Sequence, residues 1–293
     1  MSDDIQRQAI ALYDHFTHEG LDRRDFMAKL TRLAGSAAAA SALLADVACK
    51  AETQPQVAAD DHRLLTGETA WNARPGRRHT GYRAWPAVEN RRGRLPLIIV
   101  IHENRGLNDH IKDVARRLGI AGFRAVAPDF LSPTGGTPAN EDAARDAIGK
   151  LDLSKSVSDA VAMLDELSKS SRGGKVGAVG FCWGGGFVNS LAVAAGDKLA
   201  AGVPYYGPAP DPSEASKVQA PMLIHDAGLD DRVNRTSFPW VEALRAAKKP
   251  VNFYLYDGVN HAFNNDTSAE RYNKAAADLA WERTLAFFRK YLG

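Results

Sequence analysis

Three residues of the types that perform nucleophilic catalysis follow one another along the chain: Cys182, Asp230 and His261. A thiol attacks a carbonyl as thiolate, so it needs a base that accepts its proton and a third group that orients that base. Histidine and aspartate are the residue types that fill these two roles. The order and the types therefore predict a thiol nucleophile, with Asp230 as the acid and His261 as the general base.

The stretch around Cys182 has the pattern of a nucleophile elbow, G-x-S-x-G, with Cys in place of Ser. An apolar run of strand length, 176–181, leads directly into Cys182, and a helix-compatible stretch, 187–195, follows. Gly180 and Gly184 flank the thiol and let strand and helix approach closely around a strained backbone. The amides at the start of the helix favour a thiolate. The alternative is an unpaired cysteine that packs as a small core hydrophobe.

Asp230 and His261 each lie in a loop that follows an expected strand. Ligands in sheets of this kind bind beyond the carboxyl ends of the strands, so we expect both loops to converge on the elbow. Asp231 competes with Asp230 for the acid role. His102 and His225 compete for the role of base, but they precede the acid in the chain. Taken singly, Asp230 could be a turn former or helix cap and His261 a surface or core residue.

Strand and helix signals alternate from about residue 80 onward, which predicts an α/β fold with a mostly parallel central sheet and helices on both faces. Expected strands are 83–85, 95–102, 123–129, 176–181, 201–205, 222–225 and 251–256, and expected helices are 108–119, 141–150, 156–167, 187–195 and 271–292. In such a fold the oxyanion hole would use the backbone N–H groups of Trp183 and Asn104.

Four segments together resemble the dienelactone hydrolase family, which consists of carboxymethylenebutenolidase-like cysteine hydrolases of the α/β-hydrolase superfamily. They are His102-Glu103-Asn104-Arg105-Gly106-Leu107, the GFCWGGG elbow, Gly228-Leu229-Asp230 and Gly258-Val259-Asn260-His261. The resemblance implies a Cys–Asp–His triad at Cys182, Asp230 and His261. It also implies that Glu103 contacts the resting cysteine and swings away when substrate binds. The alternatives for Glu103 are an ion pair with Arg105 and a carboxylate at a helix start.

The chain departs from the resemblance at the substrate carboxylate, which the founding members of the family hold with two arginines. The stretch after the catalytic histidine reads Ala262-Phe263-Asn264-Asn265-Asp266 and lacks one of them. Arg105 and Arg145 are the remaining candidates for substrate binding, although Arg145 could equally be a solvated helix residue. The missing arginine argues against dienelactone itself as the substrate. It does not affect the prediction that a thiol hydrolyses an ester or lactone.

Composition excludes several other classes of protein. The 293 residues are 45% hydrophobic and carry 37 basic and 35 acidic side chains, a net charge of +2 that indicates no nucleic-acid surface. Two cysteines, Cys49 and Cys182, give neither a disulfide framework nor a cysteine-based metal site. His15 and His18 lie in a polar stretch, where we expect solvated side chains. We therefore expect no metal and no cofactor.

The chain divides into three parts. Residues 1–51 are interpreted as a twin-arginine-like signal or a helical arm, 52–79 as a linker and entry segment, and 80–293 as the hydrolase domain. Arg23 and Arg24 precede Phe26, and the uncharged run 33–45 is too short and too weakly apolar for a permanent membrane span. This indicates periplasmic export, with Cys49-Lys50-Ala51 as a weak cleavage site. A cytoplasmic protein that retains an Ala-rich helix is the alternative.

The predicted reaction is hydrolysis of a small ester or lactone through an acyl-cysteine intermediate. Two other classes remain: a non-catalytic binding protein that keeps the fold, and a thiol redox enzyme that uses Cys182. The redox alternative lacks a resolving partner such as a C-x-x-C motif. The sequence leaves the exact substrate and the choice between monomer and dimer undetermined.

Overall fold

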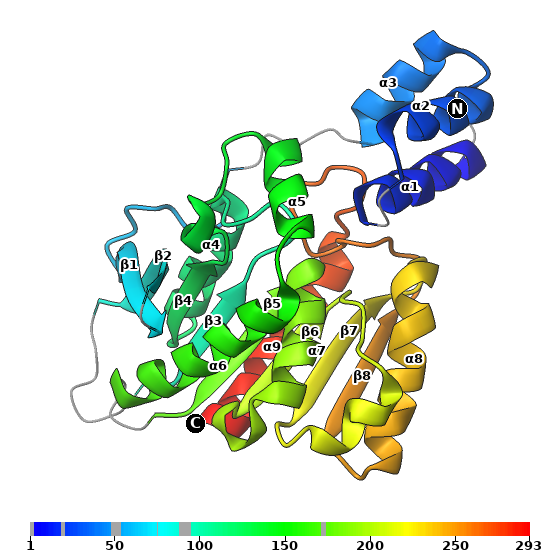
Figure 1. Ribbon diagram of the computed structural model, residues 1–293. Helices are drawn as coiled ribbons and strands as arrows, with labels where there is room; N and C mark the ends of the chain where they lie inside the picture. The colour runs from blue at the N-terminus through cyan, green and yellow to red at the C-terminus, as the bar shows by residue number, and fades with distance from the viewer. Residues whose placement is uncertain (1–2, 19–20, 48–53, 75, 88–94, 171–173) are drawn as a thin grey trace.

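The computed structural model describes residues 3–18, 21–47, 54–74, 76–87, 95–170 and 174–293. A central sheet runs through the molecule, with helices on both sides and a separate group of helices above it (Figure 1). The strands are β1 (Leu64–Arg74), β2 (Arg77–Pro86), β3 (Leu97–Ile101), β4 (Arg124–Asp129), β5 (Val176–Phe181), β6 (Ala201–Tyr205), β7 (Met222–Ala227) and β8 (Val251–Tyr256). The α-helices are α1 (Asp3–His18), α2 (Arg23–Ala34), α3 (Ala37–Val47), α4 (Asp109–Ile120), α5 (Glu141–Gly149), α6 (Leu153–Ser170), α7 (Trp183–Ala194), α8 (Asp231–Ala246) and α9 (Lys274–Leu292).

The sheet has the strand order β1-β2-β4-β3-β5-β6-β7-β8. The pairs β1–β2 and β2–β4 are antiparallel, and every pair from β4 to β8 is parallel. Strands β3, β5, β6 and β7 are buried along their whole length, as expected for uninterrupted apolar runs in a parallel sheet. The α/β fold predicted from the sequence is confirmed. Part of the segment 52–79, interpreted as linker and entry, forms β1 and the start of β2.

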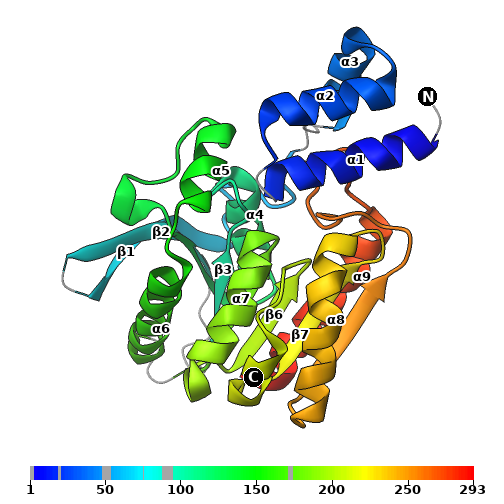
Figure 2. The same ribbon diagram turned by 45° about the vertical axis from the view of Figure 1, so that its right-hand side comes forward.

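Helices cover both faces of the sheet, as predicted (Figure 2). One apolar core joins the sheet to α4 and α9, and a second core joins it to α6, α7 and α8. In the first core Phe288 of α9 packs against Phe123, and the second core contains the fully buried Trp240. Because both faces are packed, the strands are held firmly, and the loops that follow them are fixed relative to one another.

Helices α1, α2 and α3 form a small unit of their own above the carboxyl ends of the strands (Figure 1). We call residues 3–18 and 21–47 the N-terminal unit. Its core contains Tyr13, Phe26 and Leu43, each less than a tenth exposed. The uncharged run 33–45 is divided between α2 and α3 by Gly35, whose φ of 81° needs a residue that tolerates the left-handed region. None of the described helices has the length and apolar character needed to cross a membrane.

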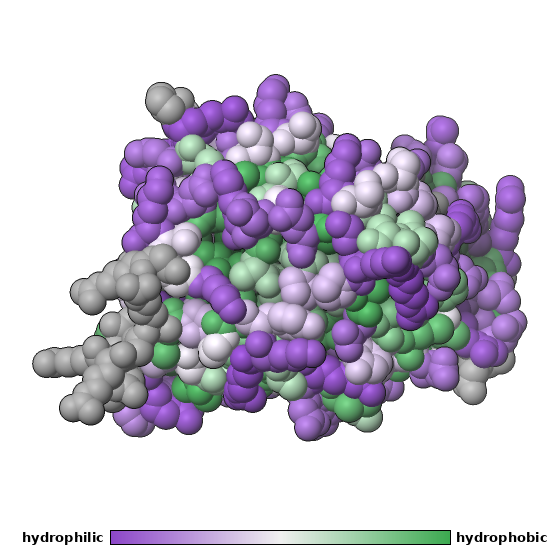
Figure 3. Space-filling model, turned by 90° about the horizontal axis from the view of Figure 1, so that it is seen from below, coloured by the Kyte–Doolittle hydropathy of each residue, from purple (hydrophilic) through white to green (hydrophobic). Residues whose placement is uncertain are grey.

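The face of the molecule opposite the N-terminal unit is largely hydrophilic, with smaller apolar patches between the polar side chains (Figure 3). The large exposed apolar residues of the whole described chain are scattered through it: Leu65, Ile120, Leu153, Leu229, Phe238, Leu255 and Leu279. Single exposed apolar residues are ordinary on folded proteins. This face therefore shows no large contiguous apolar patch among the described residues.

Candidate active site

Cys182 lies at the turn between β5 and α7, with backbone angles of φ 56° and ψ −114°. A positive φ at a residue other than glycine is strained, and such strain is stored at functional sites. The neighbouring glycines are required by space: a Cβ at Gly180 would lie 2.1 Å from the carbonyl oxygen of Gly184, and one at Gly184 would lie 2.4 Å from that of Ile101. Helix α7 begins directly after the cysteine, earlier than the expected 187–195. The side chain of Cys182 is thus placed by a strained strand–turn–helix joint.

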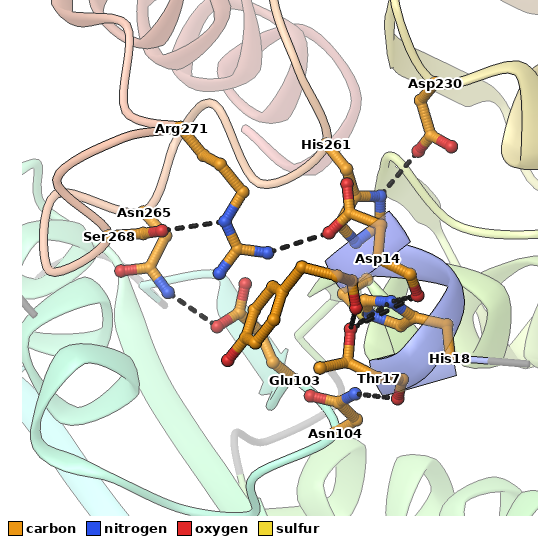
Figure 4. Close-up of polar contacts among 12 residues, drawn as sticks. Asp14, Thr17, His18, Glu103, Asn104, Asp230, His261, Asn265, Ser268 and Arg271 are labelled. Atoms are coloured by element: carbon orange, nitrogen blue, oxygen red, sulfur yellow. Dashed lines mark hydrogen bonds and ion pairs between the residues drawn. The ribbon is translucent and has the colours of Figure 1, made fainter. Parts of the chain in front are cut away.

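Asp230 and His261 meet beside this turn. Asp230 is the N-cap of α8, directly after the β7 loop, and accepts a hydrogen bond from Val233 N–H. Its Oδ2 lies 2.5 Å from His261 Nδ1 (Figure 4). The carboxylate only accepts hydrogen bonds, so Nδ1 carries the proton and Nε2 is the ring nitrogen left to face Cys182. A ring nitrogen of His261 and Cys182 Sγ lie within 4.8 Å of one another.

The charges of these groups support one another. Burial by itself lowers the pKa of His261, but the negative charges of Asp230 and of the Cys182 thiolate outweigh it and raise the pKa to about 10. Burial likewise works to raise the pKa of Asp230, and the positive charge of His261 overrides it and lowers that pKa. The imidazolium is therefore the favoured form of His261, with the Asp230 carboxylate beside it.

The loop after β3 lies on the other side of the cysteine. Glu103 is 5% exposed and accepts a hydrogen bond from Asn265 Nδ2 at 2.7 Å. Among the described contacts Glu103 is paired with neither Cys182 nor Arg105, although it lines the same cavity as Cys182. Asn104 donates its side-chain amide to the carbonyl of Thr17 at 3.1 Å. Its backbone N–H and that of Trp183, the first amide of α7, remain the candidates for an oxyanion hole.

The C-terminal end of α1 reaches into this site. His18 Nε2 lies 3.0 Å from Cys182 Sγ, and the rings of His18 and His261 meet edge to face, 4.7 Å apart. The sequence analysis expects a solvated His18, and for this residue the expectation is wrong. No local pattern could reveal the contact, because it joins positions 164 residues apart. Asp14, one turn earlier in α1, forms an ion pair with Arg271 at 3.0 Å (Figure 4).

Cys182 lies in the walls of two cavities, and both walls also include Thr17 and His18 at the end of α1. The smaller is polar and includes Glu103, Arg105, His261 and Arg271 in its wall. The larger encloses about 450 Å³, within the range of small-molecule sites. Its wall contains Phe16, Thr17, His18, Leu21, Asn104, Arg145, Asp146, Ile148, Gly149, Lys150, Trp183, Pro208 and Arg232 as well as Cys182.

Both arginines proposed for substrate binding lie in these walls and have protein partners. Arg105 pairs with Glu141 and donates to the hydroxyl of Tyr13 at 3.0 Å. Arg145 lies over the ring of Phe16, 4.8 Å from its centre, and forms an ion pair with Asp142. A substrate carboxylate would therefore compete with contacts that the N-terminal unit and α5 already make.

A family model described as "Dienelactone hydrolase family" matches residues 81–292. The chain belongs to the dienelactone hydrolase family. An Escherichia coli O157:H7 relative named "Putative carboxymethylenebutenolidase" is 31% identical over 279 residues, which cover 90% of this chain and 97% of the relative. A crystal structure from Klebsiella pneumoniae, named "Putative Dienelactone Hydrolase", is 27% identical with a TM-score of 0.69, and the match covers 78% of this chain and 99% of that one.

A third similar protein is named as a phosphotriesterase. The "Dienelactone Hydrolase-like Promiscuous Phospotriesterase P91 from Metagenomic Libraries" is 25% identical with a TM-score of 0.69, and the match covers 79% of this chain and 100% of that one. As a member of the dienelactone hydrolase family, the chain is a hydrolase of carboxylic esters or lactones. The resemblance noted in the sequence is thereby confirmed at the level of family, fold and enzyme class.

Sequence reasoning missed the residues of this member of the dienelactone hydrolase family that come from outside the family's motifs. Asn265, which holds Glu103, and Arg271, which lines the polar cavity, lie in the loop between His261 and α9. That loop is the place where the sequence lacks an arginine at the expected position, so its other polar residues were the available signal. For His18 the sequence offers no such signal.

Proposed function

We propose that this hydrolase cleaves its ester or lactone with Cys182 as nucleophile, His261 as general acid and base, and Asp230 as the residue that orients His261. The supporting observation is the strained Cys182 at the β5–α7 turn, next to an imidazole whose other nitrogen is bound to a buried carboxylate. Asp230 is 6% exposed and His261 1% exposed, so this charge arrangement is shielded from solvent.

In the first half of the reaction, the Cys182 thiolate attacks the carbonyl carbon and a C–S bond forms. The negative charge moves to the carbonyl oxygen, where the backbone N–H groups of Trp183 and Asn104 would stabilise it. The C–O bond to the leaving group then breaks, and the His261 imidazolium gives its proton to the departing oxygen. The products are an acyl-cysteine and an alcohol, or in a lactone the alcohol end of the same molecule.

In the second half, water attacks the acyl-cysteine. Neutral His261 takes a proton from the water as the new C–O bond forms, and the C–S bond breaks to release the carboxylic acid and restore the thiolate–imidazolium pair. Asp230 keeps the imidazole in one tautomer through both halves. Glu103, beside the cysteine and bonded to Asn265, is proposed to modulate the nucleophile as the family resemblance implies.

The test is burst kinetics with a p-nitrophenyl ester, combined with mass measurement of the trapped protein. We expect one equivalent of nitrophenol in the burst and an acyl group on the peptide that contains Cys182. Cys182→Ala should abolish both, whereas Cys49→Ala should leave both unchanged. A full burst in the Cys182→Ala variant would refute the mechanism. A panel of cis- and trans-dienelactone and simple esters would then define the substrate.

We also propose that residues 1–51 direct export by the twin-arginine route. Support comes from the Arg23-Arg24 pair ahead of Phe26 and from the uncharged run that follows. The sequence Cys49-Lys50-Ala51 lies outside the described residues. Cell fractionation with mass measurement of the N-terminus tests the proposal, and we expect Arg23→Lys combined with Arg24→Lys to retain the protein in the cytoplasm. The same distribution of the unchanged protein and the double variant between cytoplasm and periplasm would refute the proposal.

A further inference from the structure

The contact between His18 and Cys182 plays no part in the proposed reaction. His18 Nδ1 lies 2.8 Å from the carbonyl oxygen of Asp14. A carbonyl only accepts hydrogen bonds, so Nδ1 carries the proton and Nε2 directs its lone pair at Cys182 Sγ, 3.0 Å away, where it accepts the hydrogen bond of the thiol form. Because Nδ1 is engaged with this carbonyl, the lone pair of Nε2 is the one that the imidazole can offer to a metal ion.

His261 presents a second ring nitrogen to the same sulfur. Asp230 holds its Nδ1, and Nε2 is buried without a hydrogen-bond partner among the described residues. The three donor atoms, one each from His18, Cys182 and His261, lie within 4.8 Å of one another. Ligands bound to one tetrahedral zinc through bonds of about 2.3 Å to sulfur and about 2.0 Å to nitrogen are roughly 3.5 Å apart. The separations in the structure therefore need only small side-chain movements.

We infer that, in the chain that retains residues 1–51, His18, Cys182 and His261 form a three-ligand site for Zn²⁺, assembled when the N-terminal unit lies over the active site. One thiolate and two imidazoles are a donor set that zinc prefers, with water in the fourth position. Both histidines have the outer contacts typical of zinc ligands, a carboxylate on His261 and a backbone carbonyl on His18. The sequence-based expectation is that the chain has no metal site, and this inference departs from it.

The charges around the site are balanced for a cation. Arg271 is paired with Asp14, and the buried carboxylates of Asp230 and Glu103 offset the positive charge of Arg232 and of the metal. On binding, bonds form from zinc to Sγ and to the two Nε2 atoms, and the single proton of the thiolate–imidazolium pair leaves His261 for solvent. The bound metal occupies the nucleophile and the base together. Zinc is therefore a reversible inhibitor, and only this consequence rests on the proposed function.

The test measures metal binding directly in the full-length protein. Co²⁺, which replaces zinc in such sites, should give a near-ultraviolet thiolate-to-cobalt absorption band with a stoichiometry of one, and Zn²⁺ should displace it. His18→Ala and His18→Asn should each weaken Zn²⁺ binding by at least about tenfold. Cys182→Ser should lose the band. His15→Ala, the same change one turn earlier in α1, is the matched control and should bind as the unchanged protein does.

Two outcomes would overturn the inference: no thiolate band in the unchanged protein, or equal Zn²⁺ affinity in the His18 variants. The second would mean that the cysteine and His261 bind zinc alone. Inhibition of ester hydrolysis is measured separately, and the His18 variants should need at least about tenfold more Zn²⁺ for half-inhibition. If the protein hydrolyses no ester, the binding measurements still decide the metal site, so the two proposals fail independently.

Discussion

Asp230 sets the charge of the imidazole that faces Cys182. The variant Asp230→Asn removes the negative charge 2.5 Å from His261 Nδ1, so the pKa of His261 should fall from about 10 toward its ordinary value. The imidazolium is then lost at a lower pH. We expect kcat/KM to fall by about 10²- to 10⁴-fold and the alkaline limb of its pH profile to move to lower pH. Asp231→Asn, at the exposed neighbouring position, is the control. Equal effects of the two variants would contradict the assignment of the acid role to Asp230.

Asp226, at the end of β7, is a buried carboxyl that the reaction does not use. Burial raises its pKa to about 7, even though Ser237 donates a hydrogen bond to it. The folded protein thus keeps a proton that the unfolded chain releases near pH 4, so unfolding becomes easier as the pH rises from about 4 to about 7. Asp226→Asn lacks this titration. As the pH rises across that window, the free energy of unfolding of Asp226→Asn should increase relative to that of the unchanged protein, by up to about 4 kcal/mol.

Urea unfolding of both proteins between pH 4 and pH 8 checks this prediction. The difference between their free energies of unfolding should be smallest near pH 4 and level off above pH 7. Parallel curves would mean that Asp226 ionises in the folded protein as it does in the unfolded chain.

At the scale of elements, the joint between β5 and α7 depends on the absence of a side chain at Gly180. The added methyl of Gly180→Ala would lie 2.1 Å from a backbone oxygen of α7, so strand and helix must separate. We expect a loss of about 1–3 kcal/mol in the free energy of unfolding and a larger loss of activity, because Cys182 moves with the helix. Urea unfolding and ester hydrolysis measure the two effects.

Gly149→Ala, at the end of α5, is the matched control for Gly180→Ala. A Cβ at Gly149 meets no atom within 4 Å, and alanine favours helix by up to about 1 kcal/mol over glycine. This variant should be as stable as the unchanged protein or slightly more so. Similar destabilisation at both positions would contradict the role of the close strand–helix approach.

The elements also explain what the sequence could predict. Apolar runs such as 97–101 and 176–181 fix a parallel sheet, and the carboxyl ends of parallel strands share one edge, so Cys182, Asp230 and His261 could be brought together from their positions after strands. The strand β1 lies at the edge of the sheet, has only Leu64 and Trp71 buried and carries no such run. Its stability comes from pairing with β2, which no local sequence pattern shows. The sequence therefore indicates a linker there.

At the scale of the whole molecule, the N-terminal unit could not be placed from the sequence. Many of its contacts with the hydrolase domain are individual polar pairs, such as Asn104 with Thr17 and Gln6 with Glu270, spread over long separations in the chain. A polar helix that packs through such pairs has the same pattern as a solvated one. The sequence therefore predicts the grouping of Cys182, Asp230 and His261 and leaves out the helix that covers it.

The ion pair between Asp14 and Arg271 holds α1 over Cys182, which is 3% exposed. Asp14→Ala leaves the half-buried guanidinium of Arg271 without its ion-pair partner, so the undocked arrangement should become more populated. We expect alkylation of Cys182 by iodoacetamide to speed up by on the order of tenfold, equivalent to about 1.4 kcal/mol, and hydrogen exchange to increase throughout α1. Asp4→Ala removes an exposed ion pair with Arg7 on the same helix and should change neither rate. Peptide mapping separates Cys182 from Cys49. Unchanged alkylation in Asp14→Ala would mean that other contacts hold α1 in place.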